Sequence, residues 1–112
     1  MKTGGVVFYT DIHGHSNQTD CFMYSCDPEK INLAKHVKDD KTTIDMAVRE
    51  IGALIKSVPD ALDRFVPVFK AKTCKFETEK NKLETARVVL CQEMAILNSH
   101  TLECTFHGSE YL

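Results

Sequence analysis

The sequence predicts an α/β fold in which a mixed sheet is flanked by helices. Residues 6–10 form an almost unbroken run of β-favouring residues, apolar on both faces, which is typical of a central strand in a sheet covered on both sides. Apolar residues recur at helical spacing over 43–56, and polar and apolar residues alternate over 99–106 as in a strand. Helical sequence therefore lies between an early and a late strand, which favours the α/β class.

Length, composition and charge indicate one ordinary globular domain over residues 1–112. The chain is 43% hydrophobic and 27% charged, with a net charge of −2. No basic field points to nucleic acid or to an acidic membrane surface. No stretch has the length of a transmembrane helix or the pattern of a secretory signal. The five cysteines form no CxxC pair and suit reduced thiols in a cytoplasmic protein.

The first strand is followed by a short strand and then by the clearest helix. A polar turn leads into the short strand over 21–24, which ends before Pro28. The helix over 43–56 can be capped by Thr42 or Thr43. Its expected buried face consists of Ile44, Ala47, Ile51, Leu54 and Ile55.

Proline is expected to interrupt this helix. Pro59 lacks a backbone donor, so it should break the helix and start a second short one over 60–65. Beyond that point, 66–69 and 73–76 are expected to be extended.

Another helix is predicted before the last strand. Asn81 and Glu84 are spaced as in a capping box, and the helix should end near Ala95 or Ile96. Its expected buried residues are Leu83, Ala86, Leu90 and Met94.

The two faces of the last strand differ in chemistry. Alternation places Leu102, Cys104 and Phe106 on one face, and Ser99, Thr101, Glu103 and Thr105 on the other. Glu103 is thus a carboxylate in a row of hydroxyls near the carboxyl end of a strand. The same pattern also fits the solvated face of an edge strand.

Polar residues follow the first strand directly, as Asp11, His13, Gly14 and His15. Ligands of open α/β sheets bind outside the carboxyl ends of the strands, so these residues are candidates for a site. Neutral imidazole is the commonest metal ligand, and Asp11 could orient it. A polar turn, with Gly14 present for its permissive dihedrals, fits the spacing equally well. A four-ligand structural zinc site is a further alternative, built from His13, His15, Cys21 and Cys26.

Two ordered blocks of the chain resemble the cytosolic carboxypeptidases, zinc enzymes that trim glutamates from protein tails, notably those of tubulin. The first block is D-I-H-G-H-S at 11–16, followed by F-M-Y at 22–24. The second is T-A-R-V at 85–88, followed by N-S-H-T-L-E-C-T-F-H-G-S at 98–109. The resemblance implies the carboxyl-terminal half of such a domain, with a partial carboxypeptidase-like sheet.

The resemblance also implies a role for each site residue. His13 would be the third zinc ligand, and Glu103 the general base that activates the zinc-bound water. Arg87 would receive an acidic side chain of a protein or peptide substrate, because guanidinium pairs bidentately with carboxylates. An exposed helix arginine is the alternative for Arg87. His15 and Asp11 would orient or line the site without binding the metal.

The sequence also departs from the family. The H-x-x-E pair that supplies two zinc ligands is missing, as are the arginines that hold the substrate's terminal carboxylate. His100 and Glu103 do spell H-x-x-E, but residues three apart on a strand face opposite sides. We therefore expect a truncated gene model or degenerate copy with little or no activity alone. A non-catalytic binding module that pairs through an open sheet edge is the other alternative.

Overall fold

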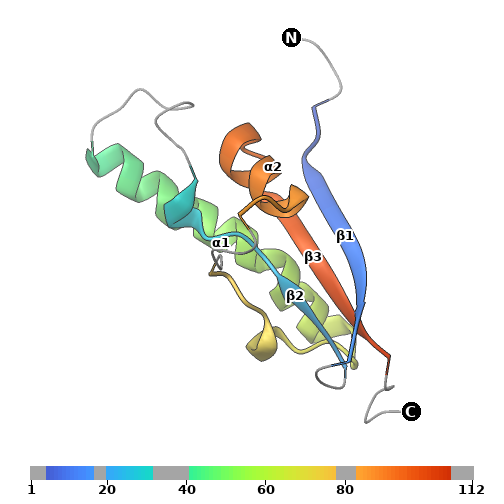
Figure 1. The fold of residues 1–112 in the computed structure, drawn as a ribbon. Coiled ribbons are helices and arrows are strands. Elements are labelled where there is room, and N and C mark those ends of the chain that lie inside the picture. The colour runs from blue at the N-terminus through green and yellow to red at the C-terminus, as the bar shows by residue number, and fades with distance from the viewer. Residues whose placement is uncertain (1–4, 17–19, 32–40, 78–82, 107–112) are drawn as a thin grey trace.

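The computed structural model describes residues 5–16, 20–31, 41–77 and 83–106. Within these ranges three strands and two α-helices are formed, and the predicted α/β class is confirmed (Figure 1). In chain order they are β1 (Phe8–His15), β2 (Cys21–Tyr24), α1 (Lys41–Phe65), α2 (Ala86–Met94) and β3 (Asn98–Thr105). Short 3-10 turns occupy Pro28–Lys30 and Ala71–Thr73.

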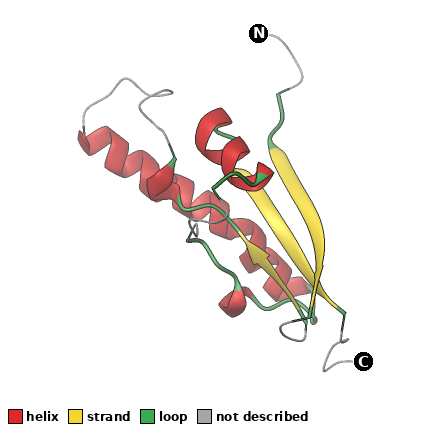
Figure 2. Cartoon of the chain, viewed as in Figure 1, coloured by secondary structure: helices red, strands yellow, loops and turns green. Residues whose placement is uncertain are grey.

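The sheet is mixed and has β3 in its middle. β1 pairs with β3 in parallel and β2 pairs with β3 in the antiparallel sense, as Figure 2 shows for the two long strands and the short one beside them. The expectation that the first strand is central is wrong for the described residues, in which β1 is an edge strand. Val6 and Val7 precede it, and Val7 is 81% exposed. An apolar run predicts a strand, but it does not specify how many neighbours that strand has.

β1 also continues further than its composition predicts. Its pairing with β3 runs as far as His15, so the alternative of a polar turn at this segment is not formed. A Cβ on Gly14 would overlap the ring of Phe106, which is exposed, so a larger residue there would displace that ring. Backbone pairing with β3 therefore outweighs the turn preference of these polar residues.

α1 passes through Pro59 without a break, contrary to the sequence-based expectation. A proline inside a helix costs about 3 kcal/mol or more, because it removes a hydrogen bond and crowds the carbonyl four residues earlier. Here Pro59 and Ile55, four residues before it, are both fully buried, so packing offsets that cost. The helical periodicity was the stronger signal at this position.

The core lies where α1 and α2 meet the sheet. The buried cluster consists of Cys26, Ile31, Ile55 and Cys91, with Ile44, Ala47, Val48, Ile51, Phe76 and Leu97 packed against it. Most of the predicted face of α1 is thus confirmed, but Leu54 is exposed. Since a helix buries only one stripe, Leu54 lies just beyond the edge that reaches the core.

α2 begins later and turns a different face inward than predicted. The helix starts at Ala86 and ends at Met94, and Ala95 directly after it adopts a left-handed conformation. Asn81 lies outside the described residues, while Leu83 and Met94 are exposed. The buried residues are Arg87, Val88 and Cys91. The predicted apolar stripe therefore lies on the wrong face of the helix. The face that is actually buried includes Arg87, which a pattern of apolar residues does not count.

The segment between the helices runs alongside β2. Single parallel bridges join Cys21 to Phe69 and Tyr24 to Lys75, on either side of the 3-10 turn. The predicted extended segments are confirmed only at Phe69 and Lys75, because residues 67–68 form a turn and Thr73 belongs to the 3-10 turn.

Candidate functional site

One face of the sheet gathers polar side chains from all three strands. In the register of β1 and β3, His13 is opposite Glu103 and Asp11 is opposite Thr101, while Tyr24 of β2 is opposite Thr101 from the other side. Directly opposed residues point to the same face of a sheet. The imidazole and carboxylate singled out in two distant parts of the sequence are therefore neighbours.

A small hollow opens on this face. It measures about 120 Å³ and is lined by Asp11, His13, Tyr24, Thr85, Arg87, Thr101 and Glu103. Four residues of the predicted site are among them, namely Asp11, His13, Arg87 and Glu103. The sequence motifs thus converge on one place, with space for a few water molecules or one small group.

Asp11 and His13 form a close pair at the rim. Nε2 of His13 lies 2.7 Å from Oδ2 of Asp11, with the side chains 55% and 38% exposed respectively. A carboxylate on one ring nitrogen fixes the orientation of an imidazole and leaves the other nitrogen for a ligand. The contact fits the predicted orienting role of Asp11, with Nδ1 of His13 as the nitrogen left to bind.

Arg87 is buried, in contrast to the alternative of an exposed helix arginine. It is only 3% exposed, and its Nη1 donates to the carbonyl oxygen of Ser25 at 2.7 Å. Its guanidinium carbon lies 5.6 Å from the centre of the Tyr24 ring. Its Nε is buried without a hydrogen-bond partner among the described residues. A buried cation with an unsatisfied donor favours an anionic ligand.

His15 does not line the hollow. Its ring is buried, with Nε2 3.2 Å from the carbonyl oxygen of Asp20 and the ring centre 4.9 Å from that of Phe22 in an edge-to-face contact. These neighbours draw the imidazole away from His13, although the two residues share one strand. Of the two roles predicted for His15, lining the site is therefore not seen.

His100 lies on the opposite face of β3 from Glu103, so the H-x-x-E of residues 100–103 does not converge. Nδ1 of His100 is 2.7 Å from Oγ of Ser25, and both residues are fully buried. Burial, followed by the charge of Arg87, lowers the pKa of His100 to about 4. His100 is thus a neutral structural group beneath the site.

Three residues of the hollow were not singled out as site residues: Tyr24, Thr85 and Thr101. Thr101 could have been found because it shares a face with Glu103 in the alternating pattern. Tyr24 could have been found once β2 was paired with β3. Thr85 carries no such signal, because it precedes α2 and its position depends on how that helix packs.

The chain was compared with family models and with curated proteins. No family model matches the chain, whereas the similar curated proteins reported next belong to one family. The chain is 36% identical over 102 residues to cytosolic carboxypeptidase 1 of Xenopus laevis, covering 91% of the chain and 8% of that protein. It is 35% identical over 102 residues to human cytosolic carboxypeptidase 1. It is 35% identical over 109 residues to mouse cytosolic carboxypeptidase 3, covering 97% of the chain and 9% of that protein.

The chain belongs to the cytosolic carboxypeptidase family. It spans only 8% to 9% of the length of the curated relatives it matches. This member of the family carries both blocks described above, and residues of both blocks meet at the hollow.

The zinc that the resemblance implies does not fit the described residues alone. A catalytic zinc takes three protein ligands. In the described part of this family member, no three His, Cys, Asp or Glu side chains are grouped so as to hold a metal ion. His13 supplies one imidazole at the hollow, and further ligands would have to come from elsewhere.

The alternative structural zinc site is not assembled either. His13, His15, Cys21 and Cys26 are all described, and they form no such group. The thiol of Cys26 is buried against the carbonyl oxygens of Ser99 and Arg87, at 3.5 and 3.6 Å. Spacing in the sequence placed these residues together, whereas the sheet separates them.

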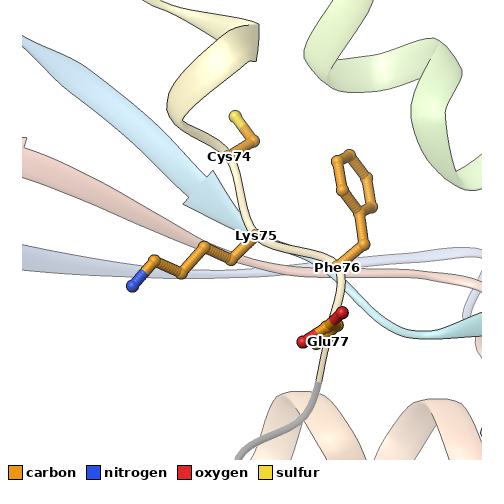
Figure 3. A pocket seen from close by; sticks show the side chains of 4 residues that line it. All are labelled: Cys74, Lys75, Phe76 and Glu77. Carbon is orange, nitrogen blue, oxygen red and sulfur yellow. The ribbon is translucent and has the colours of Figure 1, made fainter.

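A larger hollow of about 480 Å³ lies elsewhere, along Cys74, Lys75, Phe76 and Glu77 (Figure 3). Its lining side chains come from one short segment and point in different directions. None of the predicted site residues lines it, so it does not compete with the hollow at Glu103. In the described ranges, neither α-helix is both long and apolar enough to cross a bilayer.

Proposed function

We propose that this chain supplies the general base and one metal-binding imidazole of a zinc-dependent carboxypeptidase that removes carboxyl-terminal residues from proteins. The supporting observation is that His13 and Glu103, opposed across β1 and β3, line one hollow together with a buried arginine. We place the protein in the cytoplasm, in keeping with the names of its relatives.

Glu103 is the base in this proposal. A carboxylate within hydrogen-bonding reach of the attacking water takes its proton and passes it to the leaving amine. Glu103 is partly exposed at the hollow, so water can reach it. Thr101 and Tyr24 line the same wall and would help to hold the scissile group.

Arg87 selects the substrate in this proposal. Its charge is buried at the hollow and its Nε lacks an acceptor among the described residues. A carboxylate side chain would supply that acceptor and neutralise the charge. The substrate is therefore an acidic tail, glutamate-rich as in tubulin.

The isolated chain is expected to be inactive, because its described residues do not complete a zinc site. Activity would need the family's H-x-x-E region as a second chain. We would combine the two with zinc and measure the release of glutamate from a polyglutamate-tailed peptide. Glu103→Gln should lower release about 10²- to 10⁴-fold, the usual contribution of a general base.

The matched control is Glu84→Gln, which changes an exposed glutamate in the turn before α2 and should leave release unchanged. Equal release by Glu103→Gln and the unsubstituted chain would contradict the proposal. So would a stable complex of the two chains with zinc that releases nothing.

A non-catalytic binding module is the second candidate. Among the described strands β1 pairs only with β3, and Ile12 on β1 is 69% exposed. An open strand edge with apolar side chains can pair with another chain. A complex that forms through β1 without hydrolysis would favour this function.

A further inference from the structure

Two of the five cysteines lie opposite each other across the sheet. Cys21 at the start of β2 is the register partner of Cys104 near the end of β3. Their side chains point to the face of the sheet opposite to Glu103, because each is one residue removed from a residue of the hollow face. This pair is not part of the hollow.

The backbone shows which kind of pair they form. The amide of Cys21 donates to the carbonyl oxygen of Val68, and its carbonyl oxygen accepts from the amide of Lys70. Both backbone groups of Cys21 therefore point away from β3, so Cys21 and Cys104 are a non-hydrogen-bonded pair. In such pairs the Cα atoms are roughly 4.5 Å apart. Disulfides span Cα distances of roughly 4.4 to 6.8 Å, so a bond needs no large backbone shift.

The side chains are in contact and within reach of solvent. Burial, followed by the charge and hydrogen bond of the Cys21 sulfur, raises the pKa of the Cys104 thiol. Cys104 thus retains its proton beside Cys21. Both residues are partly exposed, whereas Cys26 and Cys91 are fully buried in the core.

We propose that Cys21 and Cys104 are a redox-sensitive pair that forms a reversible disulfide across β2 and β3 when it meets a peroxide. With hydrogen peroxide as the oxidant, the thiolate of one cysteine attacks a peroxide oxygen and the O–O bond breaks, which gives a sulfenic acid and a hydroxide. The hydroxide takes up the proton that the thiol lost and becomes water. The second thiol attacks that sulfur, the S–S bond forms and a second water leaves. Two thiols lose two hydrogen atoms and the peroxide is reduced to two waters.

Cys74 provides a matched control. It is also partly exposed, but its sulfur accepts from the amide of Met23 at 3.2 Å and lies 3.5 Å from the carbonyl oxygen of Lys70. Burial raises the pKa of the Cys74 thiol to about 11. A single cysteine in this setting should remain reduced under peroxide treatment that oxidises the pair.

The test is peroxide treatment of the folded 112-residue chain, followed by alkylation and peptide mapping by mass spectrometry. The unsubstituted chain and Cys74→Ser should each lose two hydrogen atoms and yield a peptide joined through Cys21 and Cys104. A reducing dithiol should reverse the change. Cys21→Ser and Cys104→Ser should give no intramolecular linkage.

Mapping of the unsubstituted chain decides the proposal even if a serine variant does not fold. Treatment in denaturant should scatter linkages over all five cysteines, which shows that the fold selects the pair. Absence of the joined peptide from a chain that circular dichroism shows to be folded would overturn the proposal. A dominant linkage through Cys74 would overturn it as well.

Discussion

The two halves of β3 differ in burial and in what they do. Ser99 and His100 in the first half are fully buried, whereas Glu103 in the second half is partly exposed. Oγ of Ser99 donates to the carbonyl oxygen of Arg87 at 2.7 Å, and His100 pairs with Ser25. A slip of one residue would turn every side chain of the strand to the other face. The buried half therefore fixes the register that places Glu103 opposite His13.

The largest stability effect should follow removal of His100. His100→Ala leaves a cavity and a buried Ser25 hydroxyl without its partner, so the free energy of unfolding should fall by about 2–4 kcal/mol. The matched change is His13→Ala on β1, where the imidazole is half exposed and the loss should stay within about 0.5 kcal/mol. Chemical denaturation of both variants measures the difference. Equal losses of stability would contradict the distinction between the buried half of β3 and the partly exposed site around Glu103.

The same histidine makes stability depend on pH. Its pKa is about 4 in the folded chain against an ordinary value of 6.5, so as pH falls the unfolded chain takes up the proton first. The contribution is fully present above pH 6.5 and declines towards pH 4, by at most about 3 kcal/mol.

Denaturation of the unsubstituted chain and of His100→Asn at pH 7 and pH 5 isolates this contribution, because both carry the other histidines. The unsubstituted chain should lose more stability between these two pH values. An identical loss in the two proteins would contradict the neutral, buried state of His100.

Arg87 contacts Ser99 in the buried half of β3 and also lines the hollow at Glu103. The effect of changing Arg87 should be intermediate in size. Arg87→Lys keeps the positive charge but removes the planar fork that binds a carboxylate at two points. In the reconstituted enzyme, the preference for a glutamate tail over a glutamine tail should fall about tenfold, equal to about 1.4 kcal/mol. Arg49→Lys on the exposed surface of α1 is the control and should leave that ratio unchanged. An unchanged ratio in Arg87→Lys would separate Arg87 from substrate choice.

The smallest stability effect should come from the open half of β3. Glu103→Gln changes a partly exposed carboxylate with no salt bridge among the described residues, so unfolding should shift by no more than about 0.5 kcal/mol. Thermal and chemical denaturation check this value. A loss as large as that of His100→Ala would mean that Glu103 supports the fold.

The fold class and four residues of the hollow, Asp11, His13, Arg87 and Glu103, were predictable because they rest on local patterns and two motifs. Alternation along 99–106 gave the face of Glu103, and the motifs gave His13 and Arg87. The burial of Arg87 was not predictable, because it depends on the Ser25 carbonyl and the Tyr24 ring, which β2 brings from a distant part of the chain. The continuity of α1 through Pro59 likewise depends on tertiary packing, which local propensity does not contain.

The most direct test is a crystal structure of this chain bound to the H-x-x-E region of the family and zinc, with the metal located by anomalous scattering. One zinc is expected about 2 Å from an imidazole nitrogen of His13. A water on that zinc should lie within hydrogen-bonding distance of the Glu103 carboxylate. A zinc bound elsewhere, or a Glu103 carboxylate turned away from the metal, would contradict the roles proposed for His13 and Glu103.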